Sequence, residues 1–434
     1  MGFILQTSII FTVILGVALQ LVLKDPIWLG LGIGKEFQPL SDFPYSCRRI
    51  EDPRLQACED MWLSEATRQL FLACSDPLSR QQWLPKYVFL FSLSIPLPCP
   101  HPSRIIAPHP APVPGPDAQH MNASGRSTRD AVIALDIDSP KSDAFEYRVL
   151  ETPGFTGTVG DGLLQLVGIT GIDAPKGDRV EILVVNNGPS VDPVTGTLLD
   201  QKSVGANSTI EVFETGPKAM GMKHVRTFAS ANISTPNNVA ALSSEEFYFT
   251  NANGPHKVGL QFFIGPLMGD GDVSFCSASK GCKRVSERHR MPNGLVRGLD
   301  GLIYVPSSMA GGVQVFEALS GNNGNGLKKV ADIPVPYAID NLSVDGKGDV
   351  YAAIFPRGIE ILQAAKDPLN ARPKSAAVRI RKEGEGVYVW EKIIEDGLGE
   401  VLPGSTTVVH DAKTGRLFFG GVTSPFIAVC EPKI

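Results

Sequence analysis

The 434-residue sequence lacks the features expected of a nucleic-acid-binding protein, a zinc protein or a serine hydrolase. It has no excess of basic residues, since 40 Lys and Arg against 45 Asp and Glu give a net charge of −5. This balance argues against binding to nucleic acid or to an anionic membrane patch. No two cysteines have CxxC spacing and no histidine-rich segment accompanies them, so a zinc site is not expected. The segment around Ser405 lacks the Gly-x-Ser-x-Gly pattern of a nucleophile elbow, which argues against a serine nucleophile.

Helical periodicity is also nearly absent, and the sequence instead repeats a unit of two short apolar strands. The 44 glycines and 34 prolines supply many turns, and Asp-Gly at 300–301 and 345–346 are hairpin signals. Six units begin near residues 59, 168, 237, 293, 341 and 405. Most of these intervals are close to the blade period of propellers. The sequence therefore predicts an all-β, six-bladed β-propeller with an insertion in the long first interval.

Acidic and amide residues recur at the starts of four of these units. They are Glu59-Asp60, Asn237-Asn238, Asn293 and Asp340-Asn341. One such residue at a strand start is ordinary turn chemistry. Four at equivalent places would aim several hard oxygen ligands at the propeller axis, which predicts a central cation site of the kind that calcium prefers.

The first 24 residues form an apolar segment without charge before Lys24. This segment is long enough to span a bilayer, and it lacks both a basic start and a clear small-x-small cleavage site. We expect a signal anchor, with a cleaved signal peptide as the alternative and a buried helix as a third possibility. Either leading option sends the rest of the chain, a linker over 25–46 and the propeller over 47–434, into the secretory pathway.

The seven cysteines favour disulfides over metal binding in that compartment. Cys47 and Cys430 lie at the two ends of the repeat array, where a propeller must close into a ring. Two other pairs flank single hairpins, and these pairs are Cys58 with Cys74 and Cys276 with Cys282. Glycosylation sequons fit a surface in the same compartment, and they lie at Asn122, Asn207 and Asn232.

Residues 85–120 do not resemble any part of a blade. An apolar run over 87–95 is followed by a dense run of prolines over 96–116, and neither alternates as a strand does. We expect the proline-rich part to be extended and disordered, and the whole insert to be dispensable for folding. A retained intron or gene-model error explains it best, and a loop that contacts a membrane or a partner is the alternative.

Three stretches carry a family resemblance. They are Met291-Pro292-Asn293-Gly294, Asp340-Asn341-Leu342-Ser343-Val344-Asp345, and the segment from Leu402-Pro403-Gly404-Ser405-Thr406 to Cys430. With these stretches the sequence resembles the serum paraoxonase/arylesterase family of calcium-dependent lactonases, within the gluconolactonase-like propellers. The similarity covers about residues 45–434 apart from the insert. It implies a six-bladed propeller that holds two calcium ions.

The resemblance also implies the ligands of the two ions. The ligands of the catalytic ion correspond to Glu59, Asn237, Asn293, Asp340 and Asn341. Two carboxylates and three amides would give a neutral cage around one Ca²⁺. The ligands of a structural ion correspond to Asp60, the carbonyl of Ile169 and Asn238. Because the family usually has a carboxylate where Asn238 stands, we expect the second site to bind calcium more weakly.

The sequence departs from the resemblance at the catalytic base. Mammalian members use a histidine pair, and the corresponding positions here are Val167 and Asn187. None of the seven histidines occupies either position. Related propellers of the gluconolactonase type work without that pair and use a metal-bound carboxylate, so Asp340 is the candidate base and Glu59 the second candidate.

These observations favour a calcium-dependent hydrolase of small lactones or aryl esters. The alternative is a non-catalytic propeller, stabilised by calcium, that binds a ligand or a partner. A condensing propeller similar to strictosidine synthase is a third hypothesis, which no residue specifically favours. The expected location is extracellular, or membrane-anchored with the propeller on the lumenal or extracellular side.

Overall fold

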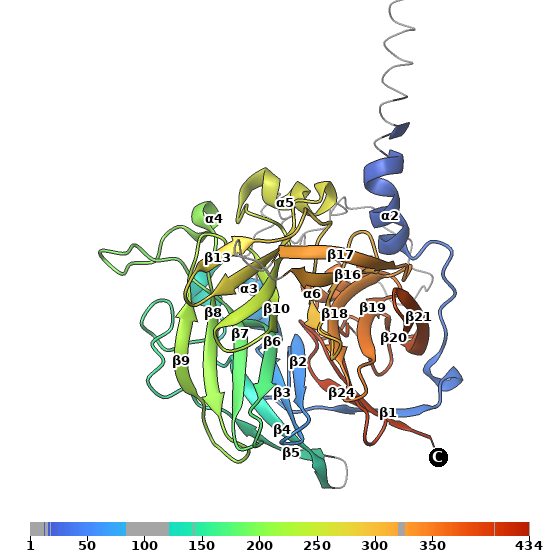
Figure 1. The fold of residues 1–434 in the computed structure, drawn as a ribbon, viewed down its shortest axis with the longest axis horizontal. Helices are drawn as coiled ribbons and strands as arrows, with labels where there is room; N and C mark the ends of the chain where they lie inside the picture. Colours follow the sequence, from blue (N-terminus) through green and yellow to red (C-terminus); the bar gives the residue numbers. More distant parts are fainter. Residues whose placement is uncertain are drawn as a thin grey trace, which may run out of the picture.

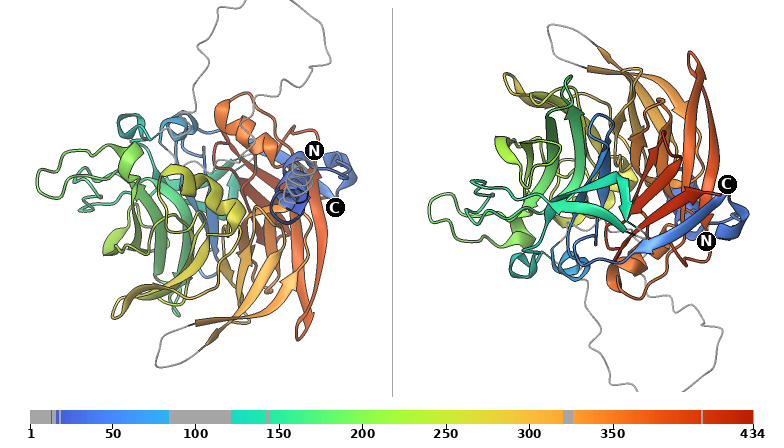
Figure 2. Two further views of the ribbon diagram at one scale, coloured as in Figure 1. Left: turned by 90° about the horizontal axis from the view of Figure 1, so that it is seen from above. Right: turned by 90° about the horizontal axis from the view of Figure 1, so that it is seen from below.

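A computed structural model describes most of the chain: Val13, Gly16, Val17 and residues 19–83, 121–141, 144–319, 326–402 and 404–433. The described strands form six four-stranded sheets around one axis, as Figures 1 and 2 show. All strand pairs within the sheets are antiparallel, from β1 with β24 to β20 with β21. This arrangement confirms the six-bladed propeller. The predicted insert over 85–120 and most of the first 24 residues lie outside the described residues.

The first three sheets follow one another along the chain, and each begins with its strand nearest the axis. The first sheet comprises β2 (Asp60–Ser64), β3 (Gln69–Cys74), β4 (Ala131–Lys141) and β5 (Ala144–Val149). The second comprises β6 (Leu166–Asp173), β7 (Val180–Gly188), β8 (Asn207–Thr215) and β9 (Lys223–Phe228). The third comprises β10 (Pro236–Ala241), β11 (Glu246–Asn251), β12 (Asp272–Ser277) and β13 (Gly281–Arg284).

The remaining sheets complete the ring, and the sixth takes its outermost strand from the N-terminal part of the chain. The fourth sheet comprises β14 (Val296–Arg297), β15 (Ile303–Pro306), β16 (Val313–Leu319) and β17 (Gly326–Ile333). The fifth comprises β18 (Ala338–Val344), β19 (Val350–Phe355), β20 (Ser375–Gly384) and β21 (Val387–Asp396). The sixth comprises β22 (Thr407–Asp411), β23 (Arg416–Gly420), β24 (Ile427–Pro432) and β1 (Tyr45–Ile50).

Ring closure depends on the pairing of β1 with β24. In this ladder Cys47 lies opposite Cys430, and the two form a disulfide with their Cα atoms 4.0 Å apart. The closure predicted from the two end cysteines is therefore confirmed. The two hairpin bridges also form, between Cys58 and Cys74 and between Cys276 and Cys282.

Apolar side chains hold neighbouring sheets together. Phe71 of the first sheet packs in one cluster with Val184 of the second, and Tyr351 of the fifth packs with Leu417 of the sixth. All six side chains of β3 are buried, because this strand is covered by a sheet on each side. The hydrophobic core therefore runs around the ring instead of lying inside any single sheet.

A hydrophobic helix was predicted only for the N-terminal segment over residues 1–24, and the helices beyond it were not predicted. The described helices are α2 (Lys24–Leu31), α3 (Pro77–Gln82), α4 (Gln201–Val204), α5 (Gly259–Met268) and α6 (Ile359–Lys366), with the π-helix η1 (Leu19–Leu23) and the 3-10 helices η2 (Leu40–Asp42) and η3 (Ala123–Gly125). Figures 1 and 2 place α2, α5 and α6 on the same face of the propeller, which we call the helical face. Apart from its first residue, Lys24, helix α2 lies in the segment predicted as a linker, and the Gly358 N–H donates to its Leu29 carbonyl at 3.2 Å.

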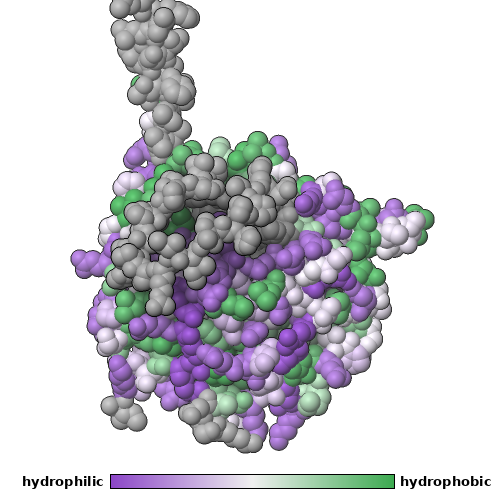
Figure 3. Space-filling model, turned by 180° about the vertical axis from the view of Figure 1, so that it is seen from behind, coloured by the Kyte–Doolittle hydropathy of each residue, from purple (hydrophilic) through white to green (hydrophobic). Residues whose placement is uncertain are grey.

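The helical face exposes several large apolar side chains. Trp28 and Leu31 belong to α2, and Leu260 and Met268 belong to α5. Figure 3 shows hydrophobic side chains gathered at this upper end of the molecule. Among the described helices, none has the length and apolar character needed to cross a bilayer.

The residues that flank the predicted insert lie side by side. Trp83 and Met121 form an isolated antiparallel bridge, and the Asn122 N–H donates to the Gln82 carbonyl at 3.0 Å. Both Trp83 and Met121 are buried in one small cluster. The chain therefore leaves and re-enters the described structure at neighbouring positions.

We expect the Cys47–Cys430 bridge to contribute more stability than the Cys276–Cys282 bridge. The first closes a separation of 383 residues and the second a separation of 6, and the chain-entropy term grows with loop length. Replacing both cysteines of a pair by serine should lower the free energy of unfolding by about 5 kcal/mol for the first pair and by about 2 kcal/mol for the second. Urea unfolding of the two double variants measures the difference, and equal losses would contradict this account.

Candidate functional site

Four propeller sheets bring the predicted ligands of the catalytic ion to the axis. Glu59 directly precedes β2, Asn237 lies in β10, Asn293 precedes β14, and Asp340 and Asn341 lie in β18. All five side chains are buried, with exposed fractions between 0% and 8%. Contacts between residues far apart in the chain join them: the Asn341 amide nitrogen donates to the carbonyl and to Oε1 of Glu59, at 3.1 Å in both cases.

β-Bulges explain why adjacent residues in these strands both lie in the axial cluster. Between Pro236 and Val239, β10 advances three residues while its partner β11 advances two, so one extra residue is accommodated beside Asn237 and Asn238. The same shift occurs in β18 between Ile339 and Leu342, around Asp340 and Asn341. A bulge reorients the side chains of its strand and is common beside functional sites. The sequence showed the repeated residue pairs but not the bulges, because register depends on the partner strand.

Three buried oxygens in this cluster receive no hydrogen bond from any described residue. They are Oε2 of Glu59, Oδ1 of Asn293 and Oδ1 of Asn341. The nitrogens of the two amides are engaged, since Asn341 donates to Glu59 and Asn293 donates to the Ser308 hydroxyl at 2.9 Å. A buried acceptor without a donor costs about 1–3 kcal/mol, so native proteins rarely leave one. Three together fit a cation that prefers oxygen ligands.

Gly294 makes this arrangement sterically possible. A Cβ at position 294 would lie 1.9 Å from Oδ1 of Asn341 and 2.6 Å from its Cα. Only glycine therefore allows the backbone after Asn293 to approach Asn341 this closely. The Leu342 N–H donates to the Gly294 carbonyl at 2.9 Å and fixes the same approach.

The axial cluster relies on amides as well as carboxylates. In the described part of the chain, no group of three or more His, Cys, Asp or Glu side chains has the arrangement of a metal site. The predicted cage contains two carboxylates, Glu59 and Asp340, and three amides. Asparagine oxygens are ordinary ligands for calcium, whereas transition metals favour imidazole and thiolate.

Burial and mutual repulsion perturb the carboxyl groups. Burial, followed by the charge of Asp60, raises the pKa of Glu59 from its ordinary 4.5 to about 8, although Arg80 and Asn341 oppose the shift. Burial also raises the pKa of Asp340 well above its ordinary value, and the charges of Glu59 and Asp60 add to this effect. A bound cation would favour the ionised forms, because opposite charge lowers a carboxyl pKa.

Arg80 is a buried cation near the axis that the sequence analysis missed. It lies in α3, which Asp76 caps by accepting the Ser79 N–H at 2.7 Å. The Arg80 guanidinium donates to the carbonyls of Ala57 at 3.3 Å and Leu166 at 2.8 Å, and its charge lowers the pKa of Glu59. The sequence feature that indicates α3 is its N-terminal cap, Asp76, followed by Pro77 at the first helical position. This six-residue helix was too short to produce a periodic pattern.

The residues predicted for the structural ion also lie together, but hydrogen bonds link them. Asp60 accepts from the Ile169 N–H at 3.0 Å, from the Asn238 side-chain nitrogen at 2.8 Å and from the Thr407 hydroxyl at 3.1 Å. The Asn238 side-chain oxygen accepts from the Val239 N–H at 2.7 Å. The second set therefore differs from the first in that the side-chain oxygens of Asp60 and Asn238 accept hydrogen bonds.

The two positions that correspond to the histidine pair offer no base. Val167 and Asn187 are buried beside a cavity of about 10 Å³, which is close to the minimum that holds one water molecule. The side-chain oxygen of Asn187 accepts from the Ser208 hydroxyl, and its carbonyl accepts from the Trp83 indole nitrogen.

Three histidines of the described chain have partners away from the axial ligands. His224 contacts Glu211 at 3.0 Å, His289 contacts Ser286 at 3.0 Å, and His410 contacts Asp345 at 2.8 Å. None of these partners belongs to the predicted metal sites. These imidazoles therefore do not replace the missing pair.

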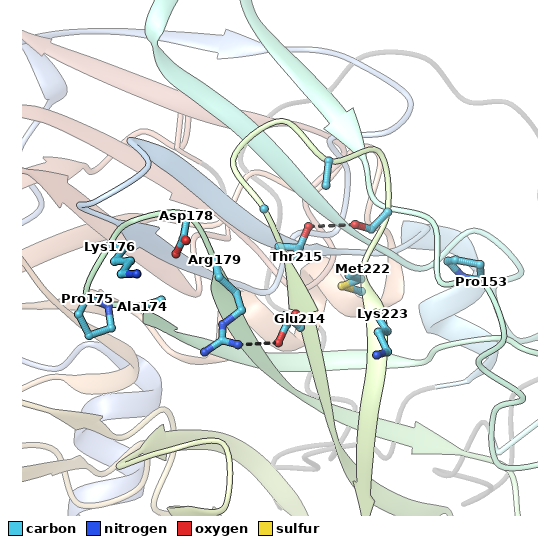
Figure 4. A pocket seen from close by; sticks show the side chains of 13 residues that line it. Pro153, Ala174, Pro175, Lys176, Asp178, Arg179, Glu214, Thr215, Met222 and Lys223 are labelled. Carbon is cyan, nitrogen blue, oxygen red and sulfur yellow. Dashed lines mark hydrogen bonds and ion pairs between the residues drawn. The ribbon is translucent and has the colours of Figure 1, made fainter.

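A surface pocket of about 950 Å³ lies on the second sheet and is separate from the axial cluster. Figure 4 shows its lining from the β6–β7 connection, including Lys176 and Arg179, and from the β8–β9 region, including Glu214 and Lys223. Arg179 and Glu214 form an ion pair at 3.3 Å across it. No predicted site residue lines this pocket. Despite its volume, the pocket is therefore not part of the axial site.

The predicted glycosylation sites lie at or near the surface. Asn122 and Asn232 are exposed, and Asn207 at the start of β8 is partly buried. The side-chain nitrogen of Asn122 donates to Gln82 and that of Asn232 donates to the Cys282 carbonyl. Glycosylation of all three positions remains a prediction.

The fold and the site together define a six-bladed propeller with an oxygen-lined axial centre. The family model described as Arylesterase matches residues 198–423, which is more than half of the 434 residues. The chain therefore belongs to the arylesterase family. The matched region contains Asn237, Asn293, Asp340 and Asn341, and closure of the ring adds Glu59 to them.

Curated relatives agree with this membership. Serum paraoxonase/arylesterase 1 of Mus musculus is 27% identical over 224 residues, an alignment that covers 50% of this chain and 59% of that protein. Serum paraoxonase/lactonase 3 of Oryctolagus cuniculus is 27% identical over 223 residues, with the same coverage. The chain thus spans less than two thirds of the length of these relatives.

Solved structures similar to this chain include a luciferin-regenerating enzyme and a gluconolactonase from Xanthomonas campestris. The first has a TM-score of 0.45 at 9% identity and covers 89% of this chain and 95% of that chain. The second has a TM-score of 0.41 at 12% identity and covers 92% of this chain and 99% of that chain.

We expect the metal-free protein to lose stability as the pH rises. Because the pKa of Glu59 is raised on folding, its neutral form stabilises the folded state most below pH 4.5, and this contribution is lost as the pH rises towards about 8. The free energy of unfolding in metal-free buffer should fall by on the order of a few kcal/mol between pH 5 and pH 8. Urea unfolding at several pH values measures this, with Glu59→Gln as the variant that should flatten the curve. A free energy that rises over this range would be inconsistent with the raised pKa.

Proposed function

We propose that this chain is a calcium-dependent hydrolase of small lactones or aryl esters. Membership of the arylesterase family supports hydrolysis of esters. The observation that most supports a metal-dependent mechanism is the set of three buried, donor-free oxygens on Glu59, Asn293 and Asn341. Asn237 and Asp340 complete the proposed cage. When bound, Ca²⁺ would polarise the ester carbonyl and stabilise the charge that develops on its oxygen.

Asp340 is the proposed general base. It is 8% exposed, against 3% for Glu59, which makes it the more accessible of the two carboxylates in the cage. Asn293 donates a hydrogen bond to it and restrains its orientation. Asp340 would accept a proton from a water molecule whose oxygen adds to the ester carbonyl carbon. The carbon–oxygen bond to the leaving group then breaks, and the leaving oxygen takes the proton.

The same residues explain why we expect slower turnover than with a histidine pair. Val167 cannot accept a proton, and the Asn187 oxygen is engaged by Ser208. A carboxylate beside a cation has a depressed pKa and is therefore a weaker base than imidazole near neutral pH. Because the carboxylate has a lower pKa than imidazole, activity should persist at mildly acidic pH, where a histidine would be protonated.

A non-catalytic propeller that keeps calcium for stability is the second candidate. The absence of the histidine pair favours it, because catalysis would then depend on a carboxylate already committed to the metal. A chelator separates the two candidates. If only stability depends on calcium, the melting temperature falls on chelation and no ester or lactone is hydrolysed at any calcium concentration.

Secretion is part of the proposal. The three disulfides fit a chain that folds in an oxidising compartment. The serum proteins among its relatives support the same location. A contact between the membrane and the N-terminal segment, if it is retained, stays a prediction.

We expect phenyl acetate or at least one member of a lactone panel to be hydrolysed in the presence of calcium. A chelator should reduce the rate to background, and added calcium should restore it, because the cation supplies the stabilisation of the developing charge. A heat-inactivated sample is the matched control. Hydrolysis that is unchanged by the chelator would contradict calcium dependence, and no hydrolysis of any substrate would favour the non-catalytic candidate.

We expect Asp340→Asn to reduce kcat by about 10²–10⁴-fold, the contribution typical of a general base, while some calcium binding remains. Calcium binding should persist because an amide oxygen can still ligate the ion. Asn238→Leu lies outside the proposed catalytic cage and serves as a comparison for nonspecific damage. Activity that instead falls with an apparent pKa near about 6.5, and loses that dependence in one His→Gln variant, would assign the base to a histidine.

A further inference from the structure

We infer that the axis of this propeller binds one divalent cation and that hydrogen bonds take the place of the second ion. The inference rests on the proposed calcium site, and it changes the number of ions that the family resemblance implies. The residues that correspond to the ligands of the structural ion do not fit a metal. The side-chain oxygens of Asp60 and Asn238 already accept hydrogen bonds from protein donors.

Asp60 is the centre of this second set, and donors surround it. The Asn238 side-chain nitrogen and the Ile169 N–H both donate to Oδ2, at 2.8 and 3.0 Å, while Thr407 donates to Oδ1. The Met61 N–H is a further donor to the same carboxylate. Asp60 is only 1% exposed, so these protein donors replace its water shell. Oδ2 thus accepts two hydrogen bonds and Oδ1 at least one, so a cation would compete with these donors for the carboxylate.

Asn238 is the residue that makes the difference. Its side-chain nitrogen is a donor, and a carboxylate at this position would have no proton to offer to Asp60. Two buried carboxylates at 2.8 Å would repel each other and would require a cation between them. An amide converts that repulsion into a hydrogen bond. The Val239 N–H fixes the amide by donating to its oxygen at 2.7 Å.

Ile169 contacts the second set through its backbone N–H, which donates to Asp60, whereas the resemblance implied its carbonyl as a ligand. The bulge in β6 between Leu166 and Ile169 accompanies this orientation. At Ile169 the backbone of β6 therefore acts as a donor to the Asp60 carboxylate.

The first set presents the opposite pattern. In the described residues no donor reaches Oε2 of Glu59 or the side-chain oxygens of Asn293 and Asn341. The two sets lie in the same protein and are equally buried, so their different hydrogen bonding reflects the local residues. One set is arranged to receive a cation and the other is complete without one.

The test is the number of calcium ions bound per chain, measured on the full-length protein. The metal-free protein is dialysed to equilibrium against buffered Ca²⁺ and the bound metal is quantified by elemental analysis. We expect one ion for the natural sequence and two for Asn238→Asp, which restores the carboxylate and removes the donor. Asn238→Leu is the matched control, because it removes the donor without adding a ligand, and it should still bind one ion.

Each outcome separates this inference from the proposed function. Two ions in the natural sequence would overturn the inference and leave the calcium-dependent function standing. No ion would overturn the proposed function and the inference with it. One ion in the natural sequence and one in a folded Asn238→Asp variant would show that Asn238 is not the residue that sets the number. If that variant does not fold, the count for the natural sequence still decides the inference.

Discussion

The axial site depends on closure of the ring. Glu59 stands at the start of the first sheet and Asn341 in the fifth, 282 residues further along the chain, yet Asn341 donates two hydrogen bonds to Glu59. They meet because β1 completes the sixth sheet beside β24, which fixes the first sheet next to the sixth. The Cys47–Cys430 disulfide joins these two strands covalently. Any event that opens this ladder would remove one carboxylate from the proposed cage.

Within the closed ring, the site keeps polar oxygens in a region that apolar packing would otherwise fill. Glu59, Asn293 and Asn341 are buried and lack donors for one oxygen each, which is costly in the absence of a cation. The surrounding sheets, held by apolar clusters between neighbours, supply the stability that permits such an arrangement. Local backbone features allow this arrangement. The bulges in β10 and β18 accommodate an extra residue beside the axial side chains, and the absence of a side chain at Gly294 leaves room for Asn341.

Much of the fold and of the site could be predicted from the sequence, because each blade repeats the same local signals. Alternating apolar strands and the two end cysteines indicated the closed propeller, and the repeated Asn and Asp residues indicated the axial cluster. Features that depend on partners far along the chain could not be predicted. The bulges follow from the register of neighbouring strands, and the contact of Arg80 with the Leu166 carbonyl follows from the packing of α3 on the second sheet.

The resemblance to the family likewise predicted which residues lie together but not the hydrogen bonds between them. It identified the residues near the axis, but it did not show that Asp60 and Asn238 are joined by a hydrogen bond. Replacing a carboxylate by an amide is a small change of side chain, but it turns a hydrogen-bond acceptor at that position into a donor. Such a reversal becomes visible only when the partner of each polar atom is known.

The most direct test of this account is an anomalous-difference map from crystals of the protein grown in calcium. We predict a peak on the propeller axis, with Oε2 of Glu59 and the side-chain oxygens of Asn293 and Asn341 at about 2.3–2.6 Å from it. A map with no axial peak, or with its peak bound by residues away from these three oxygens, would contradict it.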